Sequence, residues 1–176
     1  SITGGFQAAE DLLAFTNDGV TMGGITGSYN AVTGVLTLTG PATVAQFQAA
    51  MRAVTYKDTS DAPNTGNRTI SFKVNDGALD SNVATKTVSV AAVNDAPVVT
   101  TSGGTTASTE QVAVAIDAAL TVADADSANL ASATISITGG FQAAEDLLAF
   151  TNDGVTMGGI TGSYNAVTGV LTLTGP

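Results

Sequence analysis

Side chains with oxygen donors frame a short proline-containing segment in the middle of the chain. Asn94 and Asp95 lie within Val93–Val98, and Asp124 and Asp126 follow farther along the sequence. Proline fixes its own φ and favours extended geometry in the residue before it, and no glycine loosens this segment. Carboxylate, amide and backbone carbonyl oxygens are the ligands that calcium prefers. These residues therefore predict a calcium site at an extended connector, which we call the joint (Val93–Val98).

Each acidic motif also has a simpler interpretation when it is taken alone. Asp124-Ala125-Asp126 is compatible with a solvated turn, and Asn94 to Pro97 with a plain linker. Glu10-Asp11 and Glu145-Asp146 are expected to cap or solvate turns. Without a cation, however, Asp124 and Asp126 would repel Asp95 if the fold brought the three carboxylates together. Their combination with the charge distribution of the chain favours calcium.

The charge distribution is strongly asymmetric. The chain has 15 acidic and 5 basic residues, a net charge of −10, and all its bases lie between residues 52 and 86. Such a surface attracts hard cations and repels nucleic acid. Histidine and cysteine are absent, which removes the commonest general base, thiolate metal sites and disulfides. Paired carboxylates serve in glycosidases, but no motif marks a cleft. We therefore expect a non-enzymatic protein without a nucleic-acid partner, and the lack of an 18-residue apolar run predicts no membrane span.

A long internal repeat decides the expected organisation. Residues 1–41 recur without a change as residues 136–176, which gives a period of 135 residues (136 minus 1). A period of this length corresponds to a whole domain, since solenoid repeats are about 20–50 residues long. If a module begins at the joint, residues 1–93 are the C-terminal part of one module and residues 94–176 the N-terminal part of the next. Neither part is then a complete module, so we expect exposed strand edges that neighbouring modules of the same or adjacent chains complete.

The rest of the sequence predicts many short strands and one helix. Thr43 and Gln46 have the spacing of a capping box, and apolar residues follow at helical intervals, so a helical insertion is expected at about residues 43–53. Alternating runs bounded by Gly, Asn and Asp turns predict strands. These runs are 25–29, 34–38, 54–56, 69–74, 84–93, 98–100, 120–122 and 133–138. The expected fold class is an all-β sandwich, built from tandem modules with one short helix in each.

The module end resembles a known family. Ser71 to Ser81, which contains Val-Asn-Asp-Gly, together with the Val-Asn-Asp-Ala-Pro joint and the downstream Asp-Ala-Asp, is similar to bacterial cadherin-like and VCBS-type tandem repeats of large secreted (RTX-type) adhesins. The likeness covers essentially the whole module. It implies cadherin-like or Ig-like Greek-key sandwiches with calcium between successive modules.

The resemblance also implies a ligand set. Asn94 and Asp95 match the joint motif, and Asp124 and Asp126 match the Asp-x-Asp of the following module. Asn129 would add a backbone carbonyl, Asp76 would face the preceding module, and Glu110 would face the next joint. The Leu-Asp-Arg-Glu motif of cadherins is missing, and Asp58 is a substitute at best.

These features lead to an expected function. The chain would be a calcium-binding extender, or stalk, of a giant extracellular bacterial adhesin that is stiffened by Ca2+ at its joints. Other domains of the same protein would carry any cell-surface or matrix ligand. A self-assembling subunit of an extracellular filament or matrix is an alternative, and a carbohydrate- or surface-binding module is another.

Overall fold

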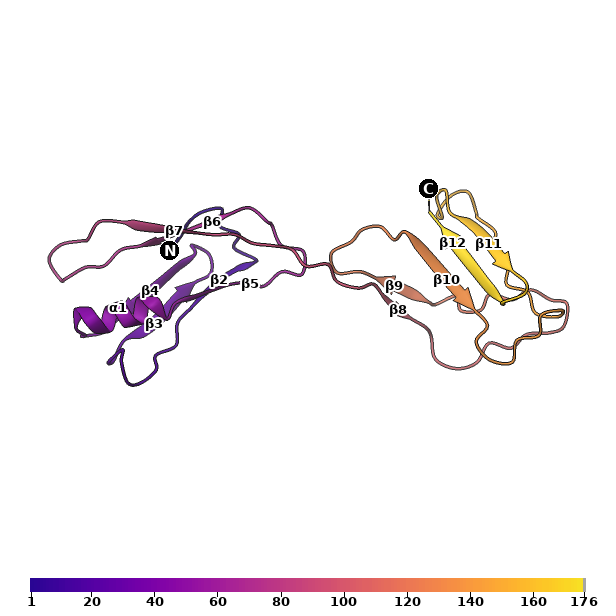
Figure 1. Ribbon diagram of the computed structural model, residues 1–176, viewed down its shortest axis with the longest axis horizontal. Helices are drawn as coiled ribbons and strands as arrows, with labels where there is room; N and C mark the ends of the chain where they lie inside the picture. Colours follow the sequence, from indigo (N-terminus) through magenta and orange to yellow (C-terminus); the bar gives the residue numbers. More distant parts are fainter. Residues whose placement is uncertain (176) are drawn as a thin grey trace. The chain divides into compact units, whose positions relative to one another are not determined.

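The structure is a computed structural model that describes residues 1–175. These residues form two compact units, Ser1–Asp126 (unit 1) and Ser127–Pro176 (unit 2). Both consist of small antiparallel sheets, and unit 1 adds one short helix (Figure 1). The predicted all-β class is therefore confirmed. The unit boundary differs from the module boundary at residues 93 and 94 that the repeat suggests, and the latter stays a prediction.

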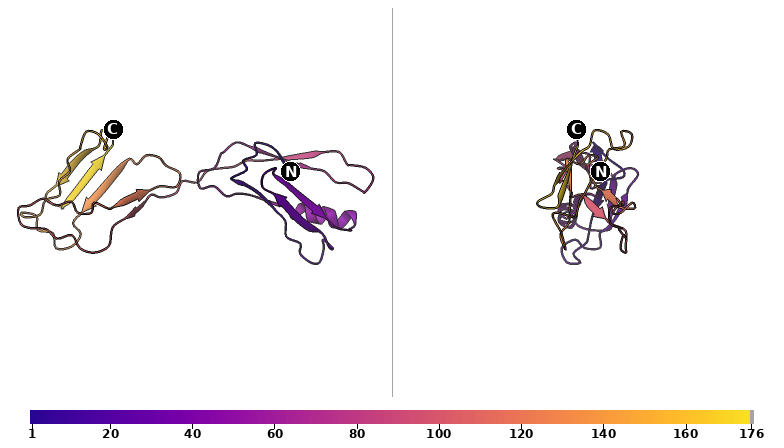
Figure 2. Two further views of the ribbon diagram at one scale, coloured as in Figure 1. Left: turned by 180° about the vertical axis from the view of Figure 1, so that it is seen from behind. Right: turned by 90° about the vertical axis from the view of Figure 1, so that its right-hand side faces the viewer.

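Unit 1 encloses its core between a three-stranded sheet and two strand pairs. The sheet has the order β1-β6-β7, formed by β1 (Ile2–Gly4), β6 (Arg68–Phe72) and β7 (Ala84–Val88). The pairs are β2 (Asp11–Ala14) with β5 (Thr55–Asp58), and β3 (Thr26–Asn30) with β4 (Val35–Thr39). Figures 1 and 2 show the sheet on one side of the unit and the pairs on the other. Buried Ile2, Leu13 and Ile70 fill the space between them.

The helix α1 (Val44–Arg52) begins and ends as its sequence predicts. The Thr43 hydroxyl accepts a hydrogen bond from the Gln46 backbone at 3.2 Å, and the Gln46 side chain accepts one from the Thr43 backbone at 2.9 Å. Ala50 is fully buried against Met22 and Ile25, so the helix covers the β3–β4 pair. The predicted capping box and helical insertion are confirmed.

The strand predicted over residues 84–93 is too long. β7 ends at Val88, which lies opposite Arg68, the first residue of β6. Beyond that point β7 has no neighbouring strand among residues 1–175, although Ser89 to Val93 continue the alternating pattern. Pairing, and not pattern alone, therefore sets the end of this strand.

The strands after the joint form a separate hairpin in unit 1. β8 (Val98–Thr100) pairs with β9 (Thr121–Ala123), and residues 101–120 connect them. Asp117 ties the ends of this connection together by accepting from the Ser102 backbone at 2.6 Å. No residue from 98 to 126 is among the buried core residues of the described chain.

Unit 2 is a single sheet of order β10-β12-β11, formed by β10 (Ser132–Ser136), β11 (Thr161–Asn165) and β12 (Val170–Thr174). β11 and β12 repeat the sequences of β3 and β4. In contrast, Asp146–Ala149, which repeats the sequence of β2, is not in a strand. The partner of β2 in unit 1 is β5, and β5 belongs to the part of the sequence that is not repeated.

Candidate functional site

Pairing of β8 with β9 brings three of the predicted calcium ligands together. Val98 lies opposite Ala123, so Asp95 precedes one strand at the point where Asp124 and Asp126 leave the other. The Asp95 backbone N–H donates to Asp126 Oδ2 at 3.3 Å. The Asp126 N–H in turn donates to Asp124 Oδ1 at 3.1 Å. These two hydrogen bonds therefore hold the joint beside the segment that follows β9.

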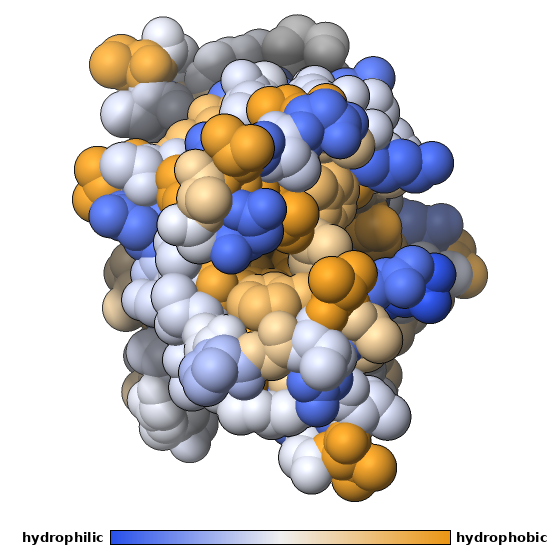
Figure 3. Space-filling view, turned by 90° about the vertical axis from the view of Figure 1, so that its left-hand side faces the viewer, coloured by the Kyte–Doolittle hydropathy of each residue, from blue (hydrophilic) through white to orange (hydrophobic). Residues whose placement is uncertain are grey.

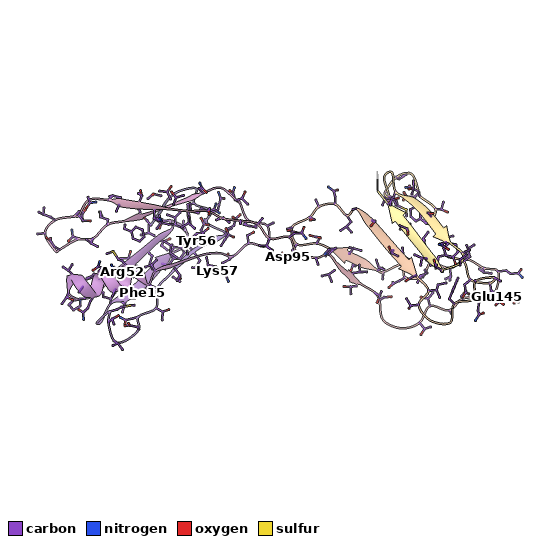
Figure 4. The ribbon with its side chains drawn as sticks, viewed as in Figure 1. Phe15, Arg52, Tyr56, Lys57, Asp95 and Glu145 are labelled. Carbon is purple, nitrogen blue, oxygen red and sulfur yellow. The ribbon has the colours of Figure 1, made fainter. Side chains whose placement is uncertain are left out.

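Two adjoining hollows add further carboxylates to this group. Asp58, Asp61 and Asp95 line the first hollow, and Asp61, Asp95 and Asp124 line the second. We call Asp58, Asp61, Asp95, Asp124 and Asp126 the joint cluster. Asp95 is exposed in the segment between β7 and β8 (Figure 4). Asp61 was missed by the sequence analysis, since the loop after β5 matches no ligand motif.

Asn94 contributes to the shape of the joint. Its amide nitrogen donates to the Asp95 carbonyl at 2.7 Å. The side chain is exposed, as is the whole stretch from Ala91 to Thr100. The amide thus lies beside the joint cluster and donates to the backbone of the next residue.

The joint cluster supplies the oxygen ligands that a calcium site needs, but its carboxylates do not point toward a common centre. Oxygen is the element that calcium selects, and aspartate supplies it. However, among residues 1–175 no three acidic side chains are arranged so that they could hold one metal ion. The Asp126 carboxylate instead accepts from the Asp95 N–H of the joint, and the Asp124 carboxylate accepts from the Asp126 N–H. Binding would therefore require these side chains to turn toward a common point.

The other predicted ligands lie elsewhere. Asp76 is in the turn between β6 and β7, at the end of that hairpin away from the joint, and accepts from the Ala78 and Leu79 backbones at 2.9 and 2.8 Å. The Leu79 hydrogen bond is the main reason that the pKa of Asp76 is lowered. Glu110 is exposed in the connection between β8 and β9, beyond the hairpin end that is opposite to the joint. Asn129 is an exposed residue of unit 2.

A second group of charges is buried in unit 1. The Arg68 side chain is 0% exposed, and its Nε lies 2.9 Å from both carboxylate oxygens of Asp11. Its Nη2 lies 3.3 Å from Glu10 and 3.3 Å from Asp58. Nη1 donates to the carbonyl oxygens of Asn64, at 2.9 Å, and Gly66.

Asp11 is the centre of this buried group. Its carboxylate accepts from the Tyr56 hydroxyl at 2.6 Å and from the Gln7 backbone at 2.8 Å, and its backbone carbonyl accepts from Tyr29 at 2.8 Å. Burial, followed by the hydrogen bond to Asp11, raises the pKa of Tyr56. Tyr56 lies on β5 (Figure 4). Asp11 caps the turn that begins at Gln7, as expected, but it is not solvated, because it is 4% exposed and paired with Arg68.

Asp58 connects the buried group with the joint cluster. One of its carboxylate oxygens accepts from Arg68 and the other from the Ser60 backbone, while its side chain lines the first hollow. The sequence gives no direct indication of this link, because Asp11 and Arg68 are 57 residues apart.

Unit 2 contains the first half of the same arrangement. Gln142 N–H donates to Asp146 at 2.8 Å, and Tyr164 donates to the Asp146 carbonyl at 2.9 Å, as Gln7 and Tyr29 do around Asp11. Glu145 precedes Asp146 and is exposed (Figure 4). Asp146 is half-buried, whereas Asp11 is buried. The 41-residue sequence therefore shapes the acidic half of this group by itself.

Comparisons with known proteins leave the family open. No protein-family model and no solved structure match the chain. A stretch of 63 residues, 35% of the chain, is 43% identical to part of halomucin from Haloquadratum walsbyi. The match covers 1% of halomucin, so the chain spans far less than two thirds of that protein. Among residues 1–175, no helix has the length and apolar character that crossing a membrane demands.

Proposed function

We propose that the chain is part of a tandem extender, or stalk, of an extracellular or cell-surface adhesin and that it binds calcium at the joint. Its role in this proposal is mechanical and not enzymatic. The modules would be cadherin-like Greek-key sandwiches with a period of 135 residues. The partial match to a protein named halomucin supports the extracellular location.

The observation that carries the proposal is the joint cluster. Five aspartates from three separate stretches of the sequence gather around one connector, and no basic residue occurs from residue 87 to residue 176. Arg68 contacts this cluster through Asp58, and its other ion pairs are with Asp11 and Glu10. Several carboxylates around one connector supply the negative charge and the oxygen ligands that a divalent cation prefers.

Calcium would supply positive charge and a common centre for these oxygens. Asp95, Asp124, Asp126 and Asp61 would hold it, together with the Asn94 amide and backbone carbonyls. Six to eight oxygens are the usual number. The protein's own contribution is the pairing of β8 with β9, which places Asp95 beside Asp126 before any ion arrives.

Calcium titration by calorimetry tests this proposal. We expect binding to the whole chain with a dissociation constant of about 0.1–1 mM, the range of extracellular calcium modules. Asp95→Asn with Asp124→Asn should weaken binding at least about tenfold, since two charged ligands are lost.

A matched control removes the same charge elsewhere. Asp18→Asn with Asp153→Asn changes two exposed turn aspartates, whose carboxylates accept from Thr21 and Thr156, and should leave binding as in the wild type. Equal weakening by both pairs would show that only net charge matters. Absence of calcium binding at millimolar concentration would refute the proposal.

A further inference from the structure

The β5–β6 loop (residues 59–67) forms part of the wall of both hollows beside the joint. Asp61 of this loop lines the first and the second hollow, each time together with Asp95. Asp58, the last residue of β5, immediately precedes the loop and lines the first hollow. The path of the loop therefore determines where two of the five carboxylates of the joint cluster lie.

Arg68 and Glu10 hold this loop from within unit 1. Arg68 Nη1 donates to the Asn64 carbonyl at 2.9 Å and also to the Gly66 carbonyl. The Asn64 N–H donates to Glu10 Oε2 at 3.0 Å, and the same oxygen lies 3.3 Å from Arg68 Nη2. At the start of the loop, the Thr59 N–H donates to the Glu10 carbonyl at 2.8 Å. The loop is therefore attached at its start and near its end to one ion pair.

This ion pair is a firm support for the loop. The Arg68 side chain is 0% exposed, and its Nε lies 2.9 Å from both carboxylate oxygens of Asp11. The Glu10 side chain is 21% exposed. A buried guanidinium is costly to move once its hydrogen bonds are complete. Its fork of donors serves Asp11 through Nε and the loop through Nη1, so the position of the loop follows from that of the strands.

We propose that Arg68 and Glu10 are positioning residues for calcium at the joint, because they hold the β5–β6 loop that presents Asp61. Their role rests on the proposed calcium binding and adds to it the residues that set the affinity. Neither of them lines a hollow, so they act on the ion through the loop. Ligands that are already held in place bind an ion more tightly, because less freedom is lost on binding.

Variants of Glu10 separate its hydrogen bond from its charge. Glu10→Ala removes the oxygen that accepts from the Asn64 N–H, whereas Glu10→Gln removes the charge and keeps an acceptor. Glu145→Ala makes the same change at the equivalent position of the repeated sequence, and unit 2 has no counterpart of the β5–β6 loop among the described residues. Arg68→Lys is the more direct change, but loss of the buried pair can unfold unit 1, so the Glu10 variants decide.

Calorimetric titration of the whole chain with calcium chloride gives the comparison. Glu10→Ala should bind calcium about tenfold more weakly than the wild type, at the lower end for residues that orient metal ligands. Glu10→Gln and Glu145→Ala should stay within about twofold of the wild type. If the wild type binds and Glu10→Ala binds equally well, the role of Glu10 and Arg68 is overturned and the proposed function stands. Equal weakening by Glu10→Ala and Glu10→Gln would show an effect of charge and would also overturn it. Absence of binding by the wild type would overturn the proposed function, and this role with it.

The coupling is reciprocal, so calcium should in turn protect the loop. Amide exchange measured by NMR should slow about tenfold at Asn64 when free calcium is ten times the dissociation constant, because an ion that binds only the ordered loop depletes the opened loop by that factor. The Gln142 N–H, which donates to Asp146 in unit 2, should exchange at an unchanged rate. Calcium binding without slower exchange at Asn64 would overturn the role of the loop and leave the proposed function in place.

Discussion

At the scale of single residues, Arg68 connects the two halves of the unit 1 sequence. Its guanidinium contacts Asp11 from β2, Asp58 from β5 and Glu10. Desolvation of such a group is expensive, and the attraction offsets it only when the hydrogen bonds are complete. Asp11 meets this condition through Arg68, Tyr56 and Gln7. Removal of one partner should therefore be costly.

The repeat supplies a matched pair of variants for this prediction. Asp11→Asn should lower the free energy of unfolding by about 3 kcal/mol, at the lower end for a broken buried pair because Glu10 and Asp58 still flank Arg68. Asp146→Asn makes the same change in the same 41-residue sequence without the arginine, and should cost within about 0.5 kcal/mol. Urea unfolding followed by circular dichroism measures both. Equal losses would contradict the role of Arg68.

The turn aspartates give a prediction about pH. The hydrogen bond from Thr21, with those from the Val20 and Thr21 backbones, lowers the pKa of Asp18 from its ordinary value of 3.8 to about 2. The contribution of this group to stability is therefore present above pH 3.8 and lost as the pH falls through 2. Thr21→Val should raise the pKa of Asp18 and leave Asp153 unchanged, and Thr156→Val should do the reverse. Carboxyl NMR titration measures each. A shift of both aspartates in either variant would contradict this local origin.

At the scale of elements, the cap of α1 is open to a direct test. Thr43→Ala removes the hydroxyl that accepts from Gln46 N–H and should cost about 1 kcal/mol of stability, whereas Thr43→Ser keeps the hydroxyl and should cost much less. Urea unfolding of the three proteins gives the comparison. Equal loss in both variants would indicate that the methyl group, and not the cap, matters.

The repeat also predicts a difference in dynamics between identical sequences. Leu12 lies in β2 opposite Lys57, whereas its counterpart Leu147 is not in a strand. The Thr59 N–H donates to the Glu10 carbonyl, so Leu12 and Lys57, two residues farther along each strand, form the next hydrogen-bonded pair. Amide exchange measured by NMR should therefore be at least about tenfold slower at Leu12 than at Leu147, because only β2 has a paired strand to open. Equal protection would mean that another copy completes unit 2 in solution.

The elements with local causes could be predicted from the sequence. The Thr43–Gln46 capping box fixes α1, and the β3–β4 and β8–β9 strands follow from alternation between turns. The end of β7 could not be predicted, because it depends on where β6 stops. The Asp11–Arg68 pair could not be predicted either, since no local pattern links residues so far apart. For the joint, the resemblance to cadherin-like repeats implied that Asp95, Asp124 and Asp126 lie together, but Asp61 approaches only through the path of the loop after β5.

At the scale of the whole molecule, exposed apolar surface favours association of copies of the chain, whereas net charge disfavours it. Figure 3 shows apolar side chains gathered at the surface of one face with hydrophilic groups around them. Val98, Val99 and Val122 are also exposed on the β8–β9 hairpin. The net charge of −10 keeps copies apart at low ionic strength.

The distance in sequence between Asp11 and Arg68 has a consequence for synthesis. Asp11 leaves the ribosome first, and 57 further residues must follow before Arg68 can pair with it. During that interval β2 is exposed, and its sequence also occurs in residues 146–149 of every other chain. Slow synthesis would thus favour pairing with the wrong copy, and rapid synthesis would favour correct closure.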